Sequence, residues 1–218
     1  EQLSDCNLIT RTGTIVDATF VEAPRQRNTR GENAAIKAGN VPEEWKTDEN
    51  KSKLRQKDVD AKWTKKGGVN YYGYKNHAKV DADSKLITDY SVTGANVHDS
   101  EELDKLIDEN DKKVYADSAY SGKAIADRLP QNVEICIHEK GYRHHQLTDE
   151  QKESNRQKSK IRSRVEHVFG FMTISFHGLT VRSVGIVRAK FNIGITNLLY
   201  NICRIETIIR KGFSPVMG

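Results

Sequence analysis

A single acidic residue in the middle of a short apolar segment is the feature that most constrains this chain. Residues 13–21 read Gly-Thr-Ile-Val-Asp-Ala-Thr-Phe-Val, and the β-branched residues around Asp17 predict a buried strand. An isolated ionised carboxylate inside such a strand costs several kcal/mol unless it is paired or binds a cation. The fold must therefore supply a counter-charge or a bound cation at Asp17.

Two further acids occupy comparable positions. Asp117 ends the short apolar segment Val-Tyr-Ala at residues 114–116, and Glu166 begins the apolar half of a predicted helix. Hard divalent cations such as Mg²⁺ prefer oxygen ligands and are typically held by a few carboxylates together with substrate phosphates. Asp17, Asp117 and Glu166 are therefore candidate ligands of one metal site.

The rest of the chain predicts strands and helices around these acids. Five strands are expected, at residues 13–21, 71–81, 86–93, 113–116 and 133–137, with a hairpin turn at 81–84. Helices are expected after Asp99, which forms a capping-box pattern with Glu102, after Gly122, and over residues 148–176. Residues 22–68 are polar and lack a clear period, which predicts a surface excursion that is partly disordered in the unbound chain.

A last helix is expected over residues 191–209. Its apolar residues recur at helical spacing and predict the side that packs on the sheet: Ile195, Leu198, Leu199, Ile202, Ile205 and Ile209. Its polar residues predict a wet or buried-polar side: Asn192, Asn197, Asn201 and Arg204.

Charge is distributed unevenly along the 218 residues. Residues 140–218 contain 14 Lys or Arg and 5 Asp or Glu, a net charge of +9, whereas the first 139 residues have a net charge of −4. A basic surface gains affinity for phosphate backbones by releasing condensed counterions. The pattern favours a nucleic-acid partner, although an ordinary solvated basic surface explains the charge alone equally well.

Composition excludes several other classes of protein. The chain is 36% apolar and 30% charged, and it has neither an apolar run of membrane-spanning length nor a signal peptide at its start. Its three cysteines, Cys6, Cys136 and Cys203, are far apart and form no C-x-x-C pair. Neither a membrane protein, a zinc site nor a disulfide framework is predicted.

Several motifs together resemble a known family. I-V-D-A-T at residues 15–19, A-D-S-A-Y-S-G at 116–122 and R-S-R-V-E-H-V-F-G at 162–170 resemble the acidic motifs of bacterial insertion-sequence transposases of the Asp-Asp-Glu type. The stretches at residues 58–67, 72–77 and 95–100 resemble the group called insertion-sequence family five. The resemblance runs in order from about Gly13 to Ile209.

This resemblance implies a ribonuclease H-like α/β fold, with a five-stranded mixed sheet, helices on both faces, and adjacent first and fourth strands. It implies one catalytic domain over residues 1–218, in which Asp17, Asp117 and Glu166 hold two Mg²⁺ ions, replaceable by Mn²⁺, for DNA cleavage and strand transfer. The implied partners are transposon ends and target DNA, with no membrane, and a homodimer on DNA is compatible with it. The implied location is the bacterial cytoplasm, at the nucleoid.

The basic segment before Glu166 supplies the expected phosphate contacts: Lys158, Lys160, Arg162 and Arg164. Arg162 lies one helical turn before Glu166, where it either contacts a phosphate near the metal ions or forms a salt bridge with Glu166. Relatives place a Tyr and a Lys where this chain has Ser159 and Thr173, so the resemblance does not extend to those DNA-end contacts. Relatives also carry a helical region ahead of the first acidic strand, and we expect that region to be missing.

Two other functions stay open at this point. A nuclease or resolvase of the same fold would share the metal site and stop at hydrolysis, and a decayed copy would only bind DNA. The aromatic residues Trp63, Tyr71, Tyr72 and Tyr74, which are interspersed with lysines, predict either a base-stacking surface or core packing.

Overall fold

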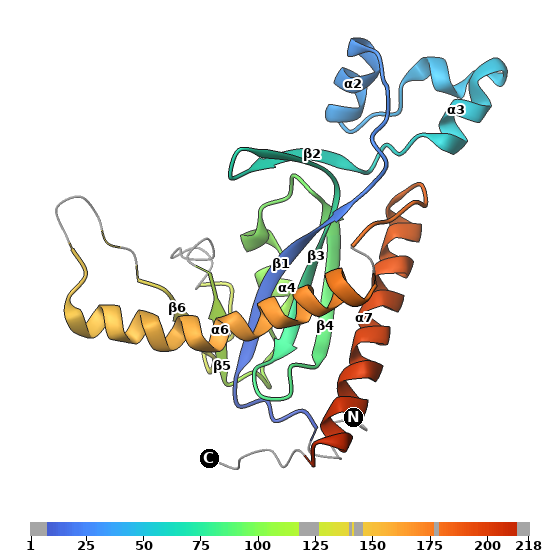
Figure 1. Ribbon diagram of the computed structural model, residues 1–218. Helices are drawn as coiled ribbons and strands as arrows, with labels where there is room; N and C mark the ends of the chain where they lie inside the picture. The colour runs from blue at the N-terminus through green and yellow to red at the C-terminus, as the bar shows by residue number, and fades with distance from the viewer. Residues whose placement is uncertain (1–7, 118–126, 140, 142–145, 177–178, 213–218) are drawn as a thin grey trace.

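The computed structural model describes residues 8–117, 127–139, 141, 146–176 and 179–212 (Figure 1). Its strands are β1 (Thr14–Glu22), β2 (Lys62–Lys66), β3 (Val69–Asp81), β4 (Ile87–Gly94), β5 (Lys113–Ala116) and β6 (Glu134–Ile137). Its α-helices are α2 (Arg30–Lys37), α3 (Lys51–Gln56), α4 (Leu103–Leu106), α6 (Asp149–Ser175) and α7 (Ile186–Arg210). Short 3-10 helices lie at Glu43–Lys46, Asp48–Asn50 and Asp99–Glu101.

The strands form one mixed sheet. Their order is β2-β3-β1-β5-β6, and β4 pairs with β3 as well. β1 runs antiparallel to β3 and parallel to β5, and β5 runs parallel to β6. The expected mixed α/β sheet is confirmed, and so is the expected adjacency of the strands that contain or precede Asp17 and Asp117.

The predicted number of five strands is wrong, because the sheet has six. The additional strand is β2, which pairs with the start of β3 through a two-residue turn at Gly67 and Gly68. Both glycines have positive φ angles, 57° and 84°, which are costly for other residues and suit a tight hairpin turn. The lysine-rich sequence of β2 lacks the apolar alternation that predicts a strand. The consecutive glycines at 67 and 68 could have predicted the hairpin turn.

The excursion at residues 22–68 is more ordered than predicted. α2 begins at a capping box, in which the side chains of Thr29 and Glu32 each accept a hydrogen bond from the other residue's backbone N–H. Trp45 is completely buried and donates its indole N–H to Glu32 over 2.7 Å, and the Lys57 ammonium lies 5.1 Å from the Trp45 ring centroid. One buried aromatic residue and one capped helix therefore organise a segment that has no hydrophobic period.

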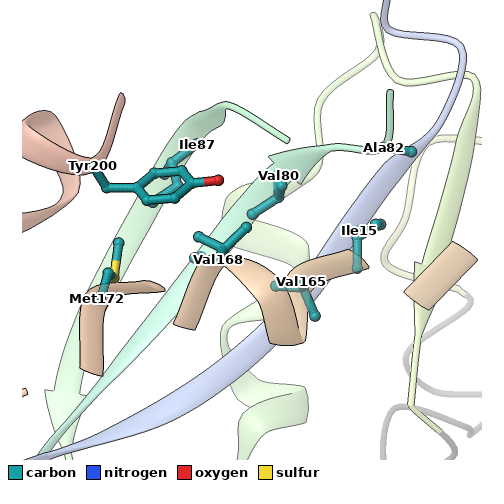
Figure 2. Close-up of a cluster of buried hydrophobic side chains, with 9 residues drawn as sticks. Ile15, Val80, Ala82, Ile87, Val165, Val168, Met172 and Tyr200 are labelled. Atoms are coloured by element: carbon teal, nitrogen blue, oxygen red, sulfur yellow. The ribbon is translucent and has the colours of Figure 1, made fainter. Parts of the chain in front are cut away.

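The sheet is covered on both faces, as expected. Successive residues of β1 point to opposite sides, so Ile15 packs under α6 and α7 whereas Val16 packs with α4 on the other face. Figure 2 shows the first cluster, in which Val165, Val168 and Met172 of α6 meet the sheet. The predicted helix after Gly122 falls largely on residues 118–126, which lie outside the described residues.

The start predicted for the helix after Asp99 is wrong in detail. His98 occupies the N-cap position of the 3-10 helix, and its ring accepts a hydrogen bond from the Ser100 backbone N–H. The Glu102 carboxylate instead binds the Ser91 hydroxyl and the Lys105 ammonium. In a capping box the Glu102 carboxylate would accept a hydrogen bond from a backbone N–H. Here it accepts hydrogen bonds from Ser91 and Lys105 instead.

The last helix forms as predicted and its asparagine side is buried and polar, one of the two expected alternatives, but most of the apolar residues expected to pack face outward. Asn197 is buried against Asn76, and Asn201 donates to and accepts from the backbone of Ile87, at 2.7 Å and 2.9 Å. Among the described residues β4 pairs with β3 alone, so its outer edge carries backbone groups without a strand partner there, which such amides satisfy. Most of the residues expected to pack are instead exposed: Ile195, Leu198, Leu199, Ile202 and Ile209.

A buried histidine on β3 makes stability depend on pH. His77 is fully buried, and burial lowers its pKa to about 4, against the opposing effect of Asp99. The folded protein therefore binds fewer protons than the unfolded chain between about pH 6.5 and pH 4, so stability falls as the pH drops through this window. We expect His77 to remove about 2 kcal/mol between pH 7 and pH 5.

Urea unfolding at both pH values, for the parent and for His77→Gln, measures this contribution. The glutamine does not titrate, so the variant should lose about 2 kcal/mol less than the parent over the same interval. If the parent and His77→Gln lost the same free energy of unfolding between pH 7 and pH 5, His77 would not be the source of the pH dependence.

Candidate active site

The pairing of β1 with β5 aligns two carboxylates. These parallel strands pair Thr14 with Val114 and Ile15 with Tyr115. Continuing this register by two residues places Asp17 beside Asp117, on neighbouring strands about 4.8 Å apart. The alternation of the strands directs Asp17 to the same face as Ile15, which is the face that α6 covers.

Asp17 lies in a mostly buried and electrically mixed environment. Its Oδ1 accepts a hydrogen bond from the Ala18 backbone N–H at 2.8 Å, and its Oδ2 lies 3.3 Å from the Arg162 guanidinium. Burial raises the pKa of Asp17, and Asp117 raises it further, whereas Ala18, Arg162 and Lys66 lower it. The two aspartates are therefore electrostatically coupled, which is expected of groups that share a site.

Helix α6 brings Glu166 to the same region. α6 crosses β5 and β1 (Figure 1) and is anchored by Val165 and Val168 in the core. Arg162 and Glu166 lie one turn apart on one side of this helix. Since Arg162 reaches Asp17, Glu166 projects from the next turn along the same side, and its side chain is exposed.

Arg162 has a partner that neither sequence-based interpretation named. Its guanidinium forms an ion pair with Asp17 at 3.3 Å, whereas the two alternatives considered from the sequence were a phosphate contact and a salt bridge with Glu166. The Nε atom of Arg162 is buried and makes no hydrogen bond within the described residues. The counter-charge required by the acid in β1 is therefore Arg162.

The donor atoms fit a hard divalent cation, although they do not form a closed ligand set. Across the described residues, which include all three acids, no group of three His, Cys, Asp or Glu side chains is positioned to hold a metal ion. The candidate ligands are nonetheless all carboxylates, and the repulsion that Asp117 exerts on Asp17 is the kind that a bound cation relieves.

The basic residues before Glu166 divide into two groups. Lys158 donates to the Ile137 carbonyl at 3.0 Å, and Arg164 donates to the Ala82 carbonyl at 2.7 Å, so both fasten α6 to the sheet. Lys160 is exposed on the helix. Of the four residues expected to contact phosphate, Lys160 is thus the one whose ammonium group points to solvent.

The two departures from the family pattern have local roles. The Ser159 hydroxyl lies 2.8 Å from His138 Nε2, which ties α6 to the segment after β6. The Thr173 hydroxyl donates to the Phe169 carbonyl within α6 at 2.9 Å. Neither side chain reaches the aligned aspartates through these contacts.

The aromatic side chains of β2 and β3 are partly buried in the core and partly exposed. Tyr72 and Tyr74 are buried, whereas Trp63 is 49% exposed. Tyr71 stacks on Phe20 with ring centroids 4.2 Å apart, and the ammonium group of Lys66 lies 5.8 Å from the Phe20 ring centroid. Lys66, one of the lysines interspersed with these aromatic residues, is a charged neighbour of Asp17, and the sequence did not predict this contact because it depends on the unpredicted strand β2.

Two carboxylates aligned on adjacent strands of a mixed sheet, with a third on a crossing helix, are typical of ribonuclease H-like enzymes that act on phosphodiesters. Residues 9–202 match the family described as Transposase DDE domain. The match covers most of the chain, which therefore belongs to this family and is a transposase domain with DNA as its partner.

The chain matches no solved structure. None of the helices in the described segments has both the length and the apolar character needed to cross a bilayer.

Proposed function

We propose that this chain is the catalytic domain of an insertion-sequence transposase, of the group called family five, which cleaves DNA and joins the freed end to a target. The parallel register of β1 and β5, which brings Asp17 beside Asp117 when continued by two residues, and the ion pair of Asp17 with Arg162 of the helix that carries Glu166 support this most strongly. The proposal treats residues 1–218 as one domain that acts at the nucleoid in the bacterial cytoplasm.

In this proposal Asp17, Asp117 and Glu166 bind two Mg²⁺ ions, for which Mn²⁺ substitutes. Such ions would supply activation of the attacking water or 3′-hydroxyl and stabilisation of the departing 3′-oxygen. For Asp17 Oδ2 to bind a cation, Arg162 would have to leave the ion pair, in which it lies 3.3 Å from that oxygen. The released guanidinium would lie one turn from Glu166, where it could contact a DNA phosphate.

Strand transfer is the experiment that separates this function from the alternatives. A duplex with a pre-cut 3′-hydroxyl end of the element, incubated with plasmid and Mg²⁺ or Mn²⁺, should become covalently joined to the plasmid. Nicked plasmid without joined product would indicate a nuclease or resolvase. Retained DNA binding without either product would indicate a decayed copy.

We expect DNA binding by this chain to weaken steeply as the salt concentration rises. Residues 140–218 carry a net charge of +9, and each phosphate contact releases about one counterion. Fluorescence anisotropy should therefore give a strongly negative slope of log affinity against log salt concentration.

Lys160→Gln should reduce this slope by about 1, because it removes one exposed phosphate contact. Lys51→Gln is the matched control, since Lys51 is exposed on α3 and lies outside the basic segment. An affinity that stays flat between low and physiological salt would contradict the expected DNA interface.

A further inference from the structure

The outer side of α7 is a continuous apolar surface. Because Asn197 and Asn201 face the sheet, several large apolar residues of this helix project away from it, with exposed fractions of 42% to 78% for Val187, Phe191, Ile195, Leu198 and Ile202, and 72% for Ile209. Monomeric soluble proteins rarely expose a contiguous apolar patch larger than a few hundred Å². Figure 1 shows α7 at the side of the molecule, with its outer face directed away from β4.

The spacing of these apolar residues is typical of helices that pack against another helix. From Phe191 to Ile209 the apolar positions are separated alternately by four and three residues, at 191, 195, 198, 202, 205 and 209. This is the 3.5-residue repeat of helices that supercoil around one another. The inner side of α7 already packs on the sheet through Ala189, Ile193, Asn197, Tyr200 and Ile208, so this second apolar repeat lies on the outer side.

We propose that α7 packs antiparallel against α7 of a second copy of this chain. The exposed stripe is self-complementary about the midpoint between Leu198 and Ile202: a two-fold axis there places Phe191 opposite Ile209, Ile195 opposite Ile205, and Leu198 opposite Ile202. A symmetric dimer uses one patch twice, so a patch that matches its own reverse fits a second copy of the chain. The inference is independent of the proposed function, since it concerns the chain without DNA.

The charged residues beside the apolar stripe favour the antiparallel arrangement. Arg188 and Glu206 are both exposed and 18 residues apart, which is five helical turns, so they lie on the same flank. Glu206 borders a shallow groove with Ile202, Ile205 and Ile209. Like flanks face each other in an antiparallel pair, so Arg188 of one copy lies on the flank that faces Glu206 of its partner, about 9 Å along the helix from the position opposite it. In a parallel pair like flanks lie on opposite sides, so Arg188 and Glu206 of the two copies would not face each other.

Sedimentation velocity of the full chain without DNA tests the dimer. We expect the parent to be dimeric in the micromolar range, and Leu198→Glu and Ile202→Glu to be monomeric, because each would bury two carboxylates at the interface. Ile174→Glu is the matched control, since Ile174 is an 80% exposed apolar residue on α6 and should leave the dimer unchanged. A cooperative unfolding transition in each variant shows that the fold is kept.

A charge reversal tests the orientation. Glu206→Arg should raise the dimer dissociation constant roughly tenfold, and adding Arg188→Glu should restore it, because the exchanged charges again face each other. A monomeric parent, a dimer that persists in Leu198→Glu, or a double charge reversal without restoration would each overturn the proposal.

Discussion

Replacing Asp17 by Asn should abolish metal-dependent DNA cleavage while leaving DNA binding at low salt nearly unchanged. The substitution keeps the size of the side chain and removes a charged metal ligand, so the ions that stabilise the attacking and departing oxygens are lost. We expect the cleavage rate to fall at least about a thousandfold. Asp117→Asn and Glu166→Gln should act alike, because the three carboxylates serve one site.

Plasmid nicking with titrated Mn²⁺ measures this effect, and fluorescence anisotropy at low salt measures the binding that should persist. Asp89→Asn is the matched control, because Asp89 is an exposed acid on β4 and takes no part in the proposed site. Parental cleavage by either aspartate variant would place the metal site elsewhere in the protein.

Replacing Gly73 by Ala should destabilise the protein more than any conservative surface substitution. Gly73 lies in β3 with a φ angle of 146°, where residues with a Cβ are strained. An added Cβ would lie 2.2 Å from the Val21 carbonyl oxygen and 2.7 Å from the Ala23 nitrogen, so the main chain of the neighbouring segment would have to move. We expect a loss of about 3 kcal/mol or more.

Gly170→Ala should stabilise the protein, in contrast to Gly73→Ala. Gly170 lies within α6, and an added Cβ there meets nothing within 4 Å. Alanine has a higher helix propensity, so this variant should gain up to about 1 kcal/mol. Chemical denaturation of both variants is the measurement, and similar stabilities for the two would contradict the close approach of β1 to β3 at Gly73.

The sheet around Asp17 could be predicted because its strands are short, rich in β-branched residues and interrupted by unusual acids. The strand β2 and the ordered excursion could not be found in this way. β2 is mostly polar, and the order of the excursion depends on one buried residue, Trp45, that meets Glu32 across a loop. Contacts of this kind produce no period in the sequence.

In the candidate site, too, the sequence predicted individual residues but not the contacts between elements that are distant in the chain. The sequence singled out three candidate acids, and continuing the register of β1 and β5 by two residues aligns Asp17 with Asp117. The partner of Arg162 was missed, because helical spacing predicts neighbours within one helix and says nothing about a strand packed beneath it. The orientation of α7 was missed for a related reason, since the backbone groups of β4 that attract Asn201 belong to another element.

The central claim is that Asp17, Asp117 and Glu166 together hold the catalytic metal ions. Titration of Mn²⁺ into the DNA-bound protein, followed by the electron paramagnetic resonance signal of the free ion, counts bound ions directly. The account predicts about two ions per chain in the parent and a clear loss of bound Mn²⁺ in Asp17→Asn and Asp117→Asn. The same number of ions, bound with the same affinity in these variants, would contradict it.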